Sequence, residues 1–103
     1  MTSQMQMPTA YPDGGPLRWQ DEQSGDLPAA VSAYFNCLID YEKVPTESQI
    51  TLLTWYCRYY INAPCWSPGP YLRKLRHQAA EIKSLRDIVK FCEEAAEWGL
   101  DPF

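Results

Sequence analysis

Apolar side chains recur at spacings of three and four residues from Leu27 onward, and this repeat puts them along one face of an α-helix. The first such stripe contains Leu27, Val31, Tyr34, Leu38 and Tyr41. No stretch alternates apolar and polar residues in the way that a half-buried β-strand requires. The sequence therefore predicts an all-α protein, built as a small bundle of three to four helices.

Helix-start signals divide this apolar pattern into segments. Thr46 and Gln49 form a capping box, in which the threonine oxygen accepts an orphan amide and the glutamine reaches back. Ser84 with Asp87 resembles a second start signal, so we expect two helices within residues 71–98; one bent helix is the alternative. The expected helices cover about residues 27–41, 50–62, 70–82 and 85–98.

Helix-stop signals agree with these boundaries. Pro64 disfavours helical geometry at the residue before it and opens a proline-rich connection that extends to Pro70. Gly99 fits the left-handed position that ends a helix, and Leu100 fits the apolar contact that accompanies it. We therefore expect the last helix to end just before Gly99.

Each later helix has an apolar face that we expect to turn inward. In the second helix this face carries Ile50, Leu53, Cys57 and Ile61. In the third helix it carries Leu72, Leu75, Ala79 and Ile82. In the fourth helix it carries Leu85, Ile88, Val89, Cys92 and Ala96.

The first 26 residues differ in composition from the rest. They are rich in proline, glycine and polar residues and lack apolar periodicity, so we expect residues 1–26 to form a disordered tail and residues 27–103 to form one helical domain. The N-terminus has no basic and apolar segments of a secretory signal, and no apolar run reaches the ~18 residues of a membrane span. We expect a cytoplasmic protein without a membrane partner.

Charge is unevenly distributed along a chain whose net charge is −4. Residues 1–57 and 91–103 are acidic, whereas residues 58–90 hold seven basic and two acidic side chains. Generic nucleic-acid binding needs a dominant positive field. This alternation favours docking between proteins, including two copies of this chain, over nucleic-acid binding.

The four cysteines do not have the spacing of a metal site. Structural zinc is usually held by pairs of ligands at short spacing, and no two of these cysteines lie within four residues of each other. We expect Cys37, Cys57 and Cys92 to pack as small apolar side chains, and Cys65, in the proline-rich connection, to be the candidate reactive thiol. The prediction is no metal, no cofactor and no enzymatic activity.

Aromatic side chains crowd into the second helix and the connection after it. A small core uses large rings for burial, but one helix in a small bundle cannot bury every side, and aromatic residues with basic neighbours are typical interface anchors. We predict a non-catalytic protein-interaction or regulatory module. Its expected partner-binding residues are Trp55, Tyr59, Tyr60, Trp66, Arg73, Lys74 and His77.

Two alternatives remain open at this stage. One is a nucleic-acid-binding protein that uses the basic third helix. In this hypothesis Arg73, Lys74 and Arg76 bind phosphate groups, and nearby aromatic rings stack on the bases. The other is a small phage-type inhibitor whose acidic segments occupy a basic site on an enzyme.

Two segments carry a resemblance to a known group of proteins. The segment Tyr56–Trp66, which ends in Asn-Ala-Pro-Cys-Trp, and the ending Trp98–Phe103 resemble small uncharacterised helical proteins of cyanobacteria. The resemblance covers about residues 27–103. It implies a bacterial cytosolic or phage-related protein and brings no established activity.

Overall fold

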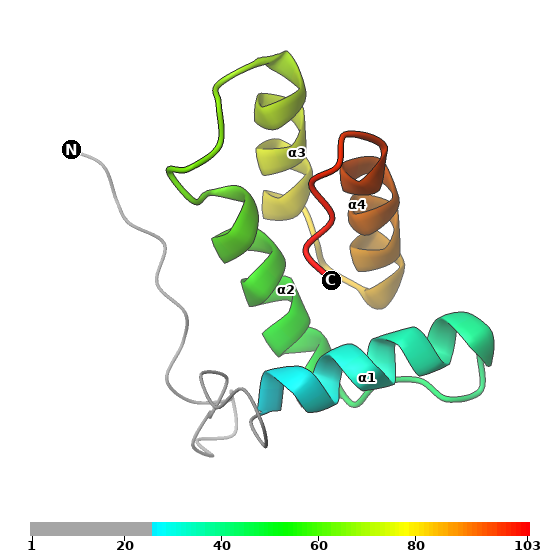
Figure 1. The fold of residues 1–103 in the computed structure, drawn as a ribbon. Coiled ribbons are helices and arrows are strands. Elements are labelled where there is room, and N and C mark those ends of the chain that lie inside the picture. Colours follow the sequence, from blue (N-terminus) through cyan, green and yellow to red (C-terminus); the bar gives the residue numbers. More distant parts are fainter. Residues whose placement is uncertain (1–25) are drawn as a thin grey trace. The chain divides into compact units, whose positions relative to one another are not determined.

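The computed structural model describes residues 26–103, and among these residues it contains four α-helices and no β-strand. The prediction of an all-α fold is confirmed, and residues 71–98 form two helices rather than one. The expected tail, residues 1–26, lies outside the described residues except for Asp26. The helices are α1 (Asp26–Ile39), α2 (Glu47–Ile61), α3 (Pro70–Ala80) and α4 (Leu85–Glu97) (Figure 1).

The described chain falls into two compact units that divide within α2, between Leu53 and Thr54. Each unit has its own buried apolar residues. In residues 26–53 these are Ala30, Tyr34, Leu52 and Leu53. In residues 54–103 they are Cys57, Ile61, Leu72, Leu75, Ala79, Ile82, Ile88, Phe91, Ala95 and Leu100. The assignment of residues 27–103 to one domain stays a prediction.

The predicted helix starts are present as hydrogen bonds. The backbone N–H of Thr46 donates to Gln49 Oε1 at 2.9 Å, and the N–H of Gln49 donates to Thr46 Oγ1 at 3.2 Å. At α4 the N–H of Asp87 donates to Ser84 Oγ at 3.4 Å. These side chains accept hydrogen bonds from backbone N–H groups at the start of each helix, which have no partner within the helix.

The end of α4 has the predicted glycine geometry. Gly99 has a φ of 70°, in the left-handed region. The N–H of Leu100 donates to the carbonyl of Ala95 at 2.9 Å, and the N–H of Gly99 donates to that of Ala96 at 3.1 Å. This pair of bonds is a Schellman motif, and the burial of Leu100 supplies its apolar contact.

The first helix ends earlier than the sequence predicts. Its last residue is Ile39 rather than Tyr41, because Asp40 Oδ1 accepts the backbone N–H of Glu42 at 3.2 Å and so favours a turn. Tyr41 therefore lies outside α1 and is 83% exposed, and Leu38 is half exposed. The prediction that this helix extends to Tyr41 is wrong, and the C-terminal part of its apolar stripe is exposed.

The buried face of α4 is rotated by about one residue from the predicted one. Phe91 and Ala95 are buried, whereas Ala96 is exposed, so the prediction for Ala96 is wrong. Burying the ring of Phe91 removes much more apolar area from water than burying the methyl group of Ala96. Helix α4 packs against α3, and just beyond the end of α4 the ring of Trp98 stacks on the ring of Tyr71, with centroids 5.0 Å apart.

Candidate functional site

Two of the four aromatic side chains of α2, Tyr56 and Tyr60, make ring contacts with other parts of the chain. The rings of Tyr60 and Trp66 lie 5.2 Å apart, and the indole Nε1 of Trp66 donates to the carbonyl of Tyr60 at 2.8 Å. Two of the predicted partner-binding residues are therefore brought together and hold the proline-rich connection against the end of α2.

This ring contact continues along α2 to the end of the chain. Tyr56 lies 6.2 Å from Tyr60 and stacks on Phe103, with centroids 5.5 Å apart. Burial raises the pKa of both tyrosines above the usual value for a phenol. The row Phe103–Tyr56–Tyr60–Trp66 thus fastens the C-terminal segment and the connection to α2, which is a structural role.

Trp55 and Tyr59, the two other aromatic residues of α2 that we predicted to bind a partner, are accessible to solvent. Tyr59 is 42% exposed, the highest value among the rings of this helix. Trp55 is half-buried, and the guanidinium carbon of Arg58 lies 5.7 Å from its ring centroid, within the range of a cation–π contact. Trp55 and Tyr59 are the part of the predicted aromatic face that remains accessible.

Two arginines join α2 and α3 in a reciprocal arrangement. Arg58 of α2 donates to carbonyls at the end of α3, and Arg76 of α3 donates to the carbonyls of Ile61 and Ala63 at 2.9 and 3.3 Å. Each guanidinium donates hydrogen bonds to backbone carbonyls at the C-terminus of the other helix, where the helix dipole is negative. Arg76, which the nucleic-acid hypothesis places on phosphates, is engaged with the backbone of its own chain.

The outer face of α3 carries the predicted basic residues. Arg73, Lys74 and His77 are all exposed. Lys74 Nζ lies 2.9 Å from Glu94 Oε1 of α4, and this hydrogen bond raises the pKa of Lys74. His77 Nε2 lies 3.8 Å from Glu81 Oε1. Acidic side chains thus accompany two of the three basic groups.

The four cysteines differ in their exposure and in their contacts. Cys65 is exposed, and its role as a reactive thiol stays a prediction. Cys57 is fully buried, but its thiol is hydrogen-bonded to the side chain of Cys92, a contact that spacing along the chain did not indicate. Within residues 26–103 no cluster of three or more His, Cys, Asp or Glu side chains is arranged to hold a metal ion.

The largest apolar exposure lies elsewhere, at the end of α1 and in the turn after it. Ile39 is 87% exposed and Tyr41 83%. We call this set the α1 patch. It contains Phe35, Leu38, Ile39, Tyr41 and Val44.

The α1 patch was not predicted from the sequence, because the expected interface lay on the aromatic second helix and Leu38 and Tyr41 were placed on the apolar stripe of the first. A signal was present in the composition of the helix. Residues 27–39 contain no charged side chain, although a helix of a small protein normally has a polar outer face.

No family model, curated protein or solved structure matches the chain. In the part of the chain that the structure describes, no helix combines the length and the apolar character needed to cross a bilayer.

Proposed function

We propose that this protein is a non-catalytic protein-interaction module that docks through the α1 patch, and that the partner is a second copy of the chain. The observation that supports this proposal is the exposure of five large apolar side chains within ten residues. Large exposed apolar patches are uncommon on monomers and typical of interaction surfaces. Full burial of one such side chain contributes about 1.5–3 kcal/mol.

The only charged side chain of α1 is Asp26 in its first turn, and Asp40, Glu42 and Lys43 lie in the turn after the helix. The uncharged length between them favours a second copy over a charged partner. In a symmetric dimer the same surface meets itself, so charges near the axis meet their like and repel. Residues 27–39 carry no charge, so two α1 helices can pair without that cost, and an antiparallel pair also opposes their dipoles. The patch is small, so the dimer should form in a concentration-dependent equilibrium.

Sedimentation over a series of protein concentrations tests the proposal. The unmodified chain should shift from monomer to dimer, and Ile39→Glu should remain monomeric because it buries a charge in the interface. Ile39 is almost fully exposed, so the helical circular dichroism and Tm of this variant should not change. A chain that remains monomeric up to millimolar concentration would contradict the dimer.

Tyr59→Glu is the matched control, because Tyr59 is an exposed apolar residue outside the α1 patch. It should dimerise as the unmodified chain does. If Tyr59→Glu abolishes association and Ile39→Glu does not, the docking surface is the Trp55–Tyr59 face that the sequence predicts. The same pair of variants therefore assigns the surface.

The nucleic-acid alternative has less support. The guanidinium of Arg76 donates to backbone carbonyls, and Lys74 is paired with Glu94, which lowers the positive field available to phosphates. A salt titration of binding to single-stranded DNA tests it, since phosphate contacts give a steep loss of affinity with salt. The phage-type inhibitor, the cytoplasmic location and the cyanobacterial resemblance stay predictions.

A further inference from the structure

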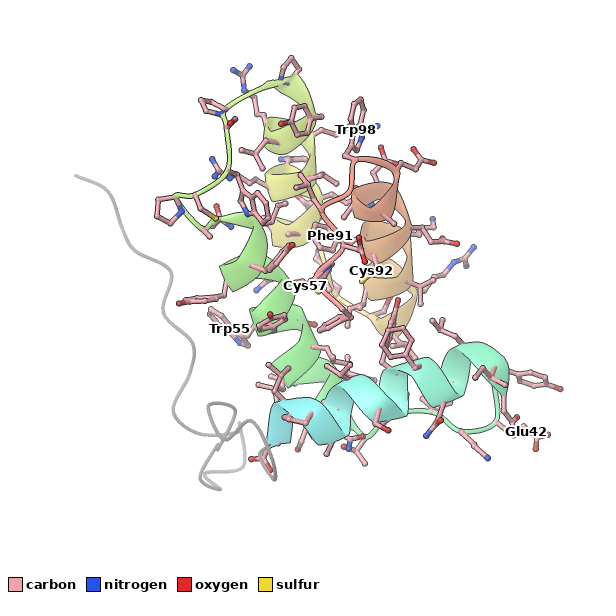
Figure 2. The ribbon with its side chains drawn as sticks, viewed as in Figure 1. Glu42, Trp55, Cys57, Phe91, Cys92 and Trp98 are labelled. Atoms are coloured by element: carbon pink, nitrogen blue, oxygen red, sulfur yellow. The ribbon has the colours of Figure 1, made fainter. Side chains whose placement is uncertain are left out.

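Cys57 and Cys92 are far apart in the sequence but meet in the fold. Cys57 lies on α2 and is fully buried, and Cys92 lies on α4 and is half-buried. Figure 2 shows the two labelled residues between these helices, close to the buried ring of Phe91. A side-chain hydrogen bond joins the two thiols, both of which are reduced. Both residues belong to the unit of residues 54–103.

The two thiols have unequal environments. The hydrogen bond to Cys92 and burial both raise the pKa of Cys57, so Cys57 keeps its proton at neutral pH. Cys92 is only half-buried, so a small solute in water reaches Cys92 before it reaches the fully buried Cys57. Cys92 thus has the features of an attacking thiol, and Cys57 those of a buried resolving thiol.

We infer that Cys57 and Cys92 form a redox-active dithiol that hydrogen peroxide converts into a disulfide joining α2 to α4. The Cys92 thiolate attacks one peroxide oxygen, the O–O bond breaks, and the departing hydroxide takes a proton to form water. The Cys57 sulfur then attacks the Cys92 sulfenic acid, the S–O bond breaks, and the Cys57 proton leaves with the oxygen as a second water. Two thiols lose two electrons and two protons in total.

The contact between the sulfurs makes this second step feasible. A disulfide needs its two sulfurs to come within about 2.05 Å of each other, and the hydrogen bond already places the two side chains next to each other. Cys65 is the more exposed thiol, but Cys92 has a second thiol beside it. The inference does not depend on the proposed docking function.

The test treats the full folded chain with hydrogen peroxide, blocks the remaining thiols under denaturing conditions and maps the disulfide by peptide mass spectrometry. We expect one predominant link, Cys57–Cys92, and a rise in Tm on the order of 10 °C that dithiothreitol reverses. A chain oxidised in urea is the control, because the unfolded chain should give mixed pairings. Links that are equally mixed in the folded chain, or a folded chain without the Cys57–Cys92 link, would overturn the inference.

Variants test the two roles separately. In Cys57→Ser the oxidation should stop at a sulfenic acid on Cys92, which dimedone traps; in Cys92→Ser, Cys57 should stay unmodified. The double variant Cys37→Ser/Cys65→Ser is the matched control and should still form the bridge. Trapping on Cys57 in place of Cys92 would refute the assigned roles, and the peptide map of the unmodified chain tests the bridge even where a variant fails to fold.

Discussion

Arg58→Met is the variant that tests the packing of α2 on α3 most directly. Arg58 Nε donates to the carbonyl of Ala79 at 3.0 Å, and its Nη2 donates to Ile82 and Ala80 at 3.1 and 3.3 Å. Ala79 and Ala80 are the last two residues of α3 and Ile82 lies two residues beyond it, so the guanidinium binds carbonyls at the C-terminal end of this helix. Methionine keeps much of the aliphatic stem and removes the donors and the charge.

The expected loss follows from these bonds. A hydrogen bond from a charged donor contributes about 1.5–3 kcal/mol, but one guanidinium makes all three, so the three contributions are not additive. The contact with the Trp55 ring adds about 0.5–1 kcal/mol at a partly exposed site. Water replaces part of what is lost, because one of the three bonds lies at an exposed position. We expect Arg58→Met to lower the free energy of unfolding by about 3 kcal/mol.

Urea unfolding followed by circular dichroism at several wavelengths measures this loss. Arg73→Met is the control, because Arg73 is an exposed arginine on α3 and its replacement should change the free energy by less than about 0.5 kcal/mol. A decrease in the free energy of unfolding of less than about 1 kcal/mol for Arg58→Met, with an unchanged m-value, would refute this reasoning. It would mean that water replaces the hydrogen bonds of the guanidinium and that the reciprocal arginines do not hold α2 against α3.

Two further predictions concern the termini of α4. Gly99→Ala should destabilise the chain by about 1 kcal/mol in thermal unfolding, because Gly99 has a φ of 70° while open space surrounds an added Cβ, so the loss is conformational; an unchanged Tm would contradict this. The pKa of Asp87 is lowered, chiefly by the backbone N–H of Lys83 that donates to its carboxylate at 3.0 Å. Its folded pKa lies below the unfolded one, so its contribution is full above about pH 4 and is lost as pH falls through the folded pKa. The stability difference between the unmodified chain and Asp87→Asn should therefore shrink below about pH 4, and a difference independent of pH would refute this origin.

The predictable part of the fold is the part that depends on neighbours in sequence. The capping box at Thr46 and Gln49, the start at Ser84 and the end at Gly99 each involve residues within a few positions of one another. Their hydrogen bonds follow from local geometry, whatever the helices pack against. This is why four helices, including the division of residues 71–98, could be predicted from the sequence.

The contacts that define the candidate sites depend on tertiary structure instead. The bonds of Arg58 and Arg76 span more than ten residues, and the Cys57–Cys92 pair joins two helices that are separated by α3 in sequence. Apolar stripes identify a face of each helix but do not specify the residue that it meets on another helix. Composition correctly placed Cys57 in the core, but it could not indicate that a second thiol lies beside it.

Clustered aromatic residues are weaker evidence for a partner than exposed aliphatic side chains on a helix that carries no charge from residue 27 to residue 39. Rings can cover one another, as Tyr60 and Trp66 do here, because stacking and burial satisfy both at once. The exposed aliphatic side chain of Ile39 has no polar group and gains nothing from water, so burial in an interface is its main route to stabilisation. The Ile39 and Tyr59 variants therefore compare two criteria for finding interfaces, and the exposure pattern predicts that Ile39 governs association.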